Sequence, residues 1–328
     1  MNGDELRGAR RERVFEAMDE ARLDVVVLGR RDSVAYATGA VGLWTAGTRP
    51  FGAAAVLVGG DRSVHLLSTW DTGVPPEVPF ENLYGVTWNP ALMSEALGAI
   101  DGLATARRIG VDALSPGFAR AAGRLAPTAE LVPADDVLGA VRAVKLPAEV
   151  GRIAVAVGAA RSGVDAAAAA LRAGASTTEA LAVVAVALAE RGSTVPTSAP
   201  VVAPVADGLV HVDVGVLVAG YEGGLGRTVV VDGSPDFRLD AQATAHQRRL
   251  LDACRPGATA AAIREAAEGA SGWMVRGTGM GFERPVVTAS LGDGVVLAAG
   301  NVLSVEITVE GIRRRDLAHL GADGTAAL

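Results

Sequence analysis

The longest apolar stretch of this chain, residues 153–189, is the feature that most limits how the protein can fold. Arg161, Asp165, Arg172 and Glu179 interrupt it, whereas a membrane span needs about 20 largely uncharged residues. We therefore expect two buried helices here and no membrane partner. A chain of 328 residues is long enough to cover these helices within a pair of domains, each with its own core.

Charge and cysteine usage exclude several classes of partner. The chain has a net charge of -7, and nucleic acids or anionic membranes are bound by clustered Lys and Arg. The single cysteine, Cys254, cannot form an internal disulfide, and there is no group of thiolates to hold zinc or iron. The charged N-terminal segment has no apolar core of the signal-peptide type. We therefore expect a cytoplasmic protein that binds neither nucleic acid nor a membrane surface.

The first part of the chain alternates helix and strand patterns. Apolar residues recur along one helical face of residues 5–23, and short valine-rich runs bounded by turn residues follow. Strands are predicted at residues 24–29, 53–58, 63–67, 109–111 and around 131, and further helices at 93–104 and 116–125. Such alternation indicates an α/β domain.

A domain boundary follows this α/β region. Pro147 stands at a predicted helix N-terminus with Glu149 in its first turn, which is a strong start signal. We place the boundary so that the domains are residues 1–144 and 145–328. In the second domain we expect a helix at residues 148–171 and a second helix that starts within residues 173–179 and ends at residue 191. Further helices are expected at 240–253 and 259–270, and strands at 209–215, 228–231, 302–309 and 313–319.

Several short motifs recur in the order found in one known family. Tyr36-Ala37-Thr38-Gly39 is similar to the Tyr-Leu-Thr-Gly of that family, and residues 142–149 are similar to its Arg-x-x-Lys-x-x-x-Glu hinge. In the second domain the similar segments are HVDVGVLVAGYEGGLGRTVVV at residues 211–231, GTGMG at 277–281, GNVLSVE at 300–306 and GIRRRD at 311–316.

On these motifs the chain resembles the pita-bread family, which includes methionine aminopeptidase, aminopeptidase P, prolidase and creatinase. The resemblance covers nearly the whole chain. It implies an α/β N-terminal domain of the creatinase type, followed by an α+β pita-bread domain. By the same analogy we expect a homodimer.

The resemblance also implies a site that has lost most of its metal ligands. The family holds two divalent ions with two Asp, one His and two Glu. Carried over residue by residue, Asp213 and Glu306 remain, whereas Gly224, Thr278 and Arg315 stand at the other three positions. Two separate carboxylates cannot bridge a pair of divalent ions. We therefore expect no metal and no cofactor. The histidine that transfers protons in creatinase also has no counterpart, because residues 193–208 contain none.

Charge balance leads to a hypothesis about Arg315. Without cations, Asp213 and Glu306 would face one pocket as like charges, which is unfavourable. We expect the guanidinium of Arg315 to bridge the two acids, and the alternative is an arginine turned to solvent. His211 lies two residues before Asp213 on a predicted strand, so both should face the same way. It is either a general acid or base, or a hydrogen-bonded core residue. The candidate catalytic residues are His211, Asp213, Glu306 and Arg315.

Two glycine-rich segments carry the candidate substrate-binding residues. The glycines of residues 220–226 permit tight backbone geometry, and the alternative there is an ordinary hairpin loop. Residues just after the loop at 277–281 line the cavity or form a surface pair. The candidates are Tyr221, Glu222, Arg227, Thr278, Glu283 and Arg284. By fold analogy, Trp44 and Trp70 are candidates for a substrate-facing wall.

Three functions are compatible with these features. The first is a repurposed, metal-independent enzyme that acts on a small amide, amidine or amino-acid-derived molecule. The second is a non-catalytic relative that keeps the fold to bind a ligand or a protein partner. The third is a weakened Xaa-Pro-type metallopeptidase with one ion held by Asp213, Glu306 and His211, which requires ligands to be reassembled from nonequivalent positions.

Overall fold

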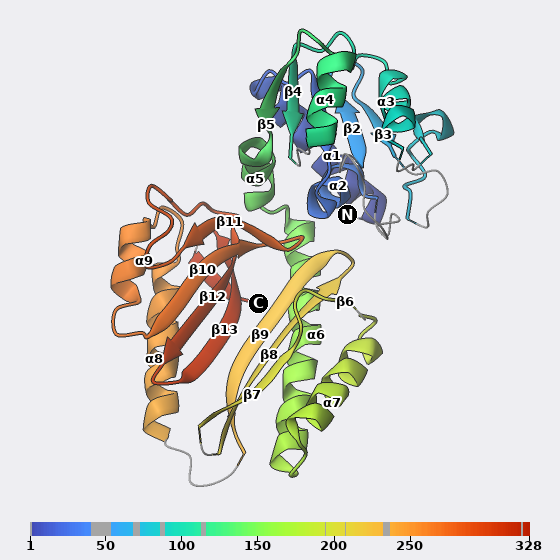
Figure 1. Cartoon of the computed structure of the whole chain (residues 1–328). Coiled ribbons are helices and arrows are strands. Elements are labelled where there is room, and N and C mark those ends of the chain that lie inside the picture. Colours follow the sequence, from blue (N-terminus) through green and yellow to red (C-terminus); the bar gives the residue numbers. More distant parts are fainter. Residues whose placement is uncertain are drawn as a thin grey trace. The chain divides into compact units, whose positions relative to one another are not determined.

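The structure, a computed structural model, describes residues 2–40, 54–67, 73–85, 89–112, 116–193, 195–206, 208–231, 237–322 and 324–328 (Figure 1). It contains two compact units, Met1–Val141 and Arg142–Leu328. Each unit is described by itself. The boundary expected from the sequence, between residues 144 and 145, lies three residues beyond the one between these units.

The first unit has a mixed sheet with helices packed on it. Within the described residues its strands are β1 (Val25–Leu28), β2 (Ala55–Val58), β3 (Ser63–Leu66), β4 (Arg108–Val111) and β5 (Glu130–Pro133), in the order β3-β2-β1-β4-β5. β1, β4 and β5 are parallel, whereas β2 is antiparallel to both of its neighbours. Helices α3 (Pro90–Gly98) and α4 (Pro116–Leu125) bury Leu97 and Phe118 against these strands. The alternating pattern therefore predicted the α/β class correctly.

The motif at residues 36–39 ends a helix that the sequence pattern did not predict. Helix α2 (Arg31–Thr38) follows α1 (Gly3–Glu20) and β1, and its last six residues are all buried. Because nearly the whole helix is buried, it has no polar face and shows no amphipathic periodicity. Gly39 ends it with a φ of 79°, a conformation that glycine adopts readily. The Thr38 hydroxyl donates a hydrogen bond to the Val34 carbonyl at 2.7 Å.

Within the described residues, the second unit contains one large sheet and four helices. Helix α5 (Asp135–Ala143) spans the boundary between the units, and the four that follow are α6 (Pro147–Arg172), α7 (Thr177–Glu190), α8 (Phe237–Ala253) and α9 (Ala260–Ala266). Its described strands are β6 (Val195–Pro196), β7 (Val201–Ala206), β8 (Leu209–Val218), β9 (Tyr221–Val230), β10 (Gly272–Thr278), β11 (Phe282–Val287), β12 (Val302–Val309), β13 (Ile312–Gly321) and β14 (Gly324–Ala327). The main order is β11-β10-β12-β13-β9-β8-β6, with β7 on β8 and β14 on β13.

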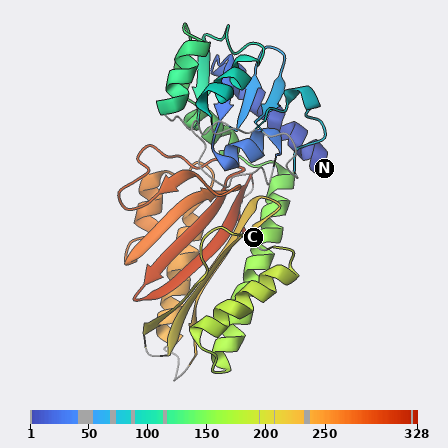
Figure 2. The same ribbon diagram turned by 45° about the vertical axis from the view of Figure 1, so that its right-hand side comes forward.

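Strand alternation separates the core face of this sheet from its polar face. On β8 the even-numbered residues Val212 and Val214 pack with α6 and α7, so His211 and Asp213 face the other way. On β12, Val305 and Ile307 pack with α8 and α9, so Glu306 also faces away from the helices. Figures 1 and 2 show these helices running alongside the strands that they cover.

Helix α6 contains the first part of the apolar segment 153–189 from which the sequence analysis began, and α7 contains the rest. By length and composition it is the one described helix that could cross a membrane, but half of its most apolar window is buried inside the protein. Ile153 and Val157 lie on its buried face. The prediction of a buried helix is therefore confirmed for this segment.

The hinge motif at residues 142–149 fastens the start of α6 to strand β11 of the same unit. The Glu283 carboxylate accepts hydrogen bonds from Arg142 Nη2 at 2.8 Å and from Lys145 Nζ at 2.6 Å, and all three side chains are buried. Burial by itself raises the pKa of Glu283, but the charges of Lys145 and Arg142 outweigh burial and hold that pKa below its ordinary value. Glu149 caps α6 through the Leu146 amide and also accepts a hydrogen bond from the Tyr221 hydroxyl at 3.0 Å.

Gly223 provides a test of how closely β9 packs on α6. A Cβ atom at this position would lie 2.0 Å from the carbonyl carbon of Ala156, which is backbone and cannot rotate away. We expect Gly223→Ala to lower the free energy of unfolding by about 3 kcal/mol, since the helix and the strand must separate. Chemical denaturation measures this loss.

Gly158→Ala is the matched control for that change. Gly158 is exposed on α6, and a Cβ atom there meets nothing within 4 Å. Because alanine favours helix, this variant is expected to be neutral or stabilised by up to about 1 kcal/mol. Equal stability in the two variants would contradict the close packing of β9 on α6.

Candidate functional site

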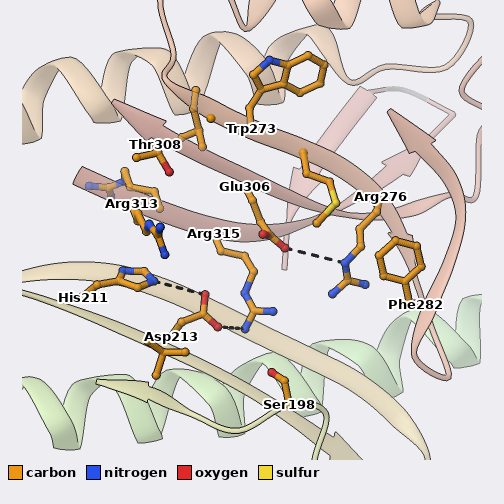
Figure 3. A pocket seen from close by; sticks show the side chains of 15 residues that line it. Ser198, His211, Asp213, Trp273, Arg276, Phe282, Glu306, Thr308, Arg313 and Arg315 are labelled. Carbon is orange, nitrogen blue, oxygen red and sulfur yellow. Dashed lines mark ion pairs between the residues drawn. The ribbon is translucent and has the colours of Figure 1, made fainter. Parts of the chain in front are cut away.

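The polar face of the second sheet contains a pocket of about 520 Å³ (Figure 3). The four candidate catalytic residues from the sequence all line it: His211, Asp213, Glu306 and Arg315. The other lining residues are Ser198, Val201, Gly272, Trp273, Met274, Arg276, Phe282, Ile307, Thr308, Arg313 and Arg314. The structure thus brings the four candidates together, and their catalytic roles stay predictions.

Strand register explains why these side chains meet. Glu306 on β12 is directly opposite Arg315 on β13, which in turn is opposite Gly226 on β9. Gly226 is opposite Asp213 on β8. One row of the sheet therefore contains an acid, an arginine, a glycine and an acid on four adjacent strands. Residues opposite one another in a sheet project to the same face, so this row forms the floor of the pocket.

Two glycines leave space for the central ion pair. A Cβ atom at Gly224 would lie 2.7 Å from the guanidinium carbon of Arg315, and one at Gly226 would lie 2.5 Å from Asp213 Oδ2. The glycine-rich segment is therefore part of strand β9 and not the loop that its composition suggested. The turn itself is at Ala219 and Gly220, where φ is positive. These glycines act by lacking side chains and not by permitting a turn.

Charges of opposite sign alternate through the site. Arg315 Nη2 is 2.6 Å from Asp213 Oδ1, and Arg315 Nη1 is 4.0 Å from Glu222 Oε1. Glu222 binds Arg276 through both of its oxygens, at 2.5 and 3.2 Å. Arg276 Nε is 3.9 Å from Glu306 Oε1. The order is thus Asp213, Arg315, Glu222, Arg276, Glu306.

The predicted bridge by Arg315 is therefore correct for one acid and wrong for the other. Arg315 pairs with Asp213, as expected, and also donates a hydrogen bond to the Val214 carbonyl at 2.7 Å. Within the described residues, the ion pair of Glu306 is with Arg276 instead. The physical reason is that a buried acid, Glu222, binds Arg276 at 2.5 Å and lies 4.0 Å from Arg315, so a second arginine is brought into the site and lies beside Glu306.

Burial shifts the pKa values of two pocket residues. Burial, followed by repulsion from Arg313 and Arg315, lowers the pKa of His211 to about 4, so its imidazole is neutral near pH 7. Burial raises the pKa of Asp213 above its ordinary value even though Arg315 acts in the opposite direction. His211 Nε2 lies 3.9 Å from Asp213 Oδ2, too far for a direct hydrogen bond.

The six candidate substrate-binding residues lie outside the set that lines the pocket. Tyr221 is fully buried and bonds to Glu149, and Glu283 is bound by the hinge motif. Arg227 forms an ion pair with Asp316 and donates to the Arg315 carbonyl at 2.8 Å.

The remaining three candidates are also placed differently from one another. Arg284 is exposed, so Glu283 and Arg284 do not share the cavity wall or form an exposed pair. Glu222 lies behind the pocket, against its arginines. Thr278 is fully buried on β10, and its hydroxyl has no hydrogen-bond partner in the described part of the chain.

Sequence reasoning missed Arg276, which links Glu222 to Glu306. The signal was available, because an arginine beside Val275 on an apolar strand must find an acid if it is buried. Phe282 was also missed, and its ring lies 5.0 Å from the Arg276 guanidinium, a cation–π distance. Trp44 and Trp70 lie outside the described residues.

The residues of this site do not fit a pair of divalent ions. In the part of the chain that the structure describes, no three His, Cys, Asp or Glu side chains come together as a possible metal site. Asp213 already binds the Arg315 guanidinium, and Glu306 lies beside that of Arg276. A cation would have to approach two fixed positive charges, and each carboxylate of the cluster already lies beside one of them.

Comparison with known proteins identifies both units. Residues 10–144 match the Creatinase/Prolidase N-terminal domain, and residues 186–322 match Metallopeptidase family M24. No curated protein matches this chain.

Solved structures of similar fold cover nearly the whole chain. A prolidase from Pyrococcus horikoshii OT3 is 21% identical, with a TM-score of 0.75 over 97% of each chain. A Xaa-Pro dipeptidase from Bacillus anthracis is 19% identical, with a TM-score of 0.74 over 99% of this chain and 97% of that one. An X-Pro aminopeptidase from Thermotoga maritima MSB8 is 17% identical, with a TM-score of 0.77 over 97% and 96%. With its two domain matches, the chain belongs to the pita-bread family of creatinases, prolidases and aminopeptidase P-like proteins.

Proposed function

We propose that this chain is a metal-independent, repurposed relative of creatinase and aminopeptidase P that acts on a small amide, amidine or amino-acid-derived substrate. The observation that carries the proposal is the ion pair of Arg315 with Asp213 over Gly224. In the family resemblance, Asp213 is a ligand position, and Gly224 and Arg315 replace two other ligands. The two replacements are in contact, so one arginine side chain fills the space that the glycine leaves.

The charge of the guanidinium supports a site without metal. Asp213 is mostly buried, and a buried carboxylate needs a positive partner. Arg315 supplies that charge as a fixed part of the chain, with its side chain only 7% exposed. A divalent ion at Asp213 would be repelled by this guanidinium at short range.

The pocket contains groups suited to acid–base chemistry on a polar substrate. Glu306 is the most exposed of the acids in the alternating charges, at 33%, and is our candidate for accepting a proton from the substrate. The guanidiniums of Arg276 and Arg315 are candidates for holding negative charge that develops on a carbonyl or amidine. His211, neutral near pH 7, is a candidate hydrogen-bond partner for the substrate.

A non-catalytic ligand-binding protein is the second candidate function. It is favoured by the pairing of both pocket acids with arginines, since a carboxylate held beside a guanidinium is less available to a substrate. A weakened metallopeptidase of the Xaa-Pro type, which the names of the similar structures suggest, ranks last because no three His, Cys, Asp or Glu side chains of the described residues come together as a metal site. We further propose a cytoplasmic homodimer that binds neither nucleic acid nor membrane.

Metal dependence tests the proposal. Wild-type protein purified without chelator is expected to contain no stoichiometric manganese, cobalt or zinc, and its Tm should not change when these ions are added. The double variant Gly224→Asp/Arg315→Glu exchanges the guanidinium for two carboxylates and is expected to gain metal-dependent stability. Binding at a hundred times the Kd raises stability by about 2.7 kcal/mol.

The single variant Gly224→Asp is the control, because Arg315 still occupies the space beside position 224. Its Tm should not respond to metal. Elemental analysis and thermal unfolding measure both effects. A metal-dependent rise in the Tm of the wild-type protein would contradict the proposal.

The low pKa of His211 predicts a pH dependence of stability. The folded-state pKa is about 4 and the ordinary value is 6.5, so between these values the unfolded chain binds a proton that the folded chain does not. Stability should therefore fall as the pH drops from 6.5 towards 4, and this loss should be smaller in His211→Asn. Urea unfolding across that pH range measures it.

His246→Asn is the matched control for this titration, because His246 lies on α8 outside the residues that line the pocket. Each variant replaces one imidazole by an amide, so a change found in His211→Asn and not in His246→Asn belongs to the pocket position. Parallel curves for wild type and His211→Asn would show that His211 is not buried in its neutral form.

A further inference from the structure

We propose that Glu222 is the positioning residue of this pocket, a buried carboxylate that holds Arg276 beside Glu306 and places negative charge near Arg315. This inference rests on the proposed function, because it assigns to Glu222 the arrangement of the groups that would meet a substrate. The sequence pointed to Glu222 as a residue that touches substrate. The geometry points to action through the two arginines instead.

The contacts of Glu222 are directed at both guanidiniums. Its Oε1 lies 2.5 Å from Arg276 Nη2 and 4.0 Å from Arg315 Nη1, and its Oε2 lies 3.2 Å from Arg276 Nη1. The two contacts with Arg276 join both carboxylate oxygens to two guanidinium nitrogens, which is the geometry that best fixes the plane of a guanidinium. Glu222 therefore determines where Arg276 can lie.

Burial separates Glu222 from any substrate in the pocket. Its side chain is 3% exposed, compared with 33% for Glu306 and 21% for Asp213, and it is not among the lining residues. A buried carboxylate of this kind cannot accept a proton from a ligand directly. It acts by neutralising arginines that would otherwise repel each other.

The backbone around Glu222 is rigidly held. Its amide donates a hydrogen bond to the Gly279 carbonyl at 2.6 Å, which joins the start of β9 to the loop that follows β10. The next residue, Gly223, packs directly on the backbone of α6 at Ala156. Because residues 222 and 224 face the same side of β9, the Glu222 carboxylate lies on the side where Gly224 leaves room for Arg315.

The ring of Phe282 restricts the position of the Arg276 guanidinium from another side. Its ring centroid is 5.0 Å from the guanidinium carbon, and Phe282 itself is more than half exposed. Without Glu222, the restraints that remain among the described residues would be the aromatic contact, the 3.9 Å approach to Glu306 and a 3.4 Å hydrogen bond from Arg276 Nη1 to the Gly277 carbonyl. Each of these is longer than the 2.5 Å contact with Glu222, and the carboxylate is the partner that binds two guanidinium nitrogens at once.

Site-resolved chemical modification tests this inference. Phenylglyoxal reacts with arginine side chains, and peptide mass spectrometry reports the rate at each one. In folded Glu222→Gln, which keeps the shape but loses the charge, the modification rate of Arg276 is expected to rise severalfold over wild type. Glu222→Asp keeps the charge on a shorter side chain and should give an intermediate rate.

Glu283→Gln is the matched control, because Glu283 is another buried carboxylate that binds an arginine, Arg142, away from the pocket. It should accelerate modification of Arg142 and leave Arg276 unchanged, whereas Glu222→Gln should do the reverse. Circular dichroism establishes that each variant is folded. If Glu222→Gln does not fold, the modification rate of Arg276 is measured in Glu222→Asp instead.

An unchanged Arg276 rate in the folded Glu222 variant would overturn the inference. The inference would also be overturned if Glu222→Gln accelerated the modification of Arg142 and Arg276 equally, since that would indicate general loosening of the unit. The measurement needs neither substrate nor turnover. A failure of the proposed function in metal binding or catalysis is therefore distinguishable from a failure of the role of Glu222.

Discussion

Two charged side chains can meet over strand β9 only because that strand has no side chains between them. Gly224 and Gly226 lie beneath Arg315 and Asp213, and a Cβ atom at either position would overlap one of these groups. The ion pair in turn determines what the pocket offers a ligand, because it gives the buried acid a permanent positive partner. The chemistry of the site therefore depends on missing side chains as much as on charged ones.

The second unit contains two clusters of buried charge with different consequences. In the hinge cluster, Glu283 is enclosed by Arg142 and Lys145, and none of them lines the pocket. In the pocket cluster, three acids alternate with two arginines, and two of the acids are partly exposed to the cavity. The first cluster secures the start of α6, and the second is available to a ligand.

Curvature of the sheet creates the contact that sequence reasoning missed. β9 and β10 are separated by β12 and β13 in the strand order, yet Glu222 at the start of β9 binds Arg276 on β10. β9 pairs with β13 only through Gly226 and Arg227, so the first residues of β9 diverge from their neighbour. They approach the loop after β10, where the Glu222 amide bonds to Gly279. Strand alternation predicts the face of a side chain but not this approach of non-neighbouring strands.

The sequence by itself determined the α/β and α+β classes, the buried helix α6 and the side of the sheet on which Asp213, Glu306 and Arg315 lie. These follow from local periodicity, helix start signals and motif order, which need no knowledge of distant contacts. Only the tertiary structure decided that Arg315 binds Asp213 and not Glu306, that Glu306 lies beside Arg276, and that Tyr221 and Glu283 serve the hinge. A buried charge takes whichever opposite charge the folded backbone brings within reach, and that depends on strand pairing and curvature across the whole sheet.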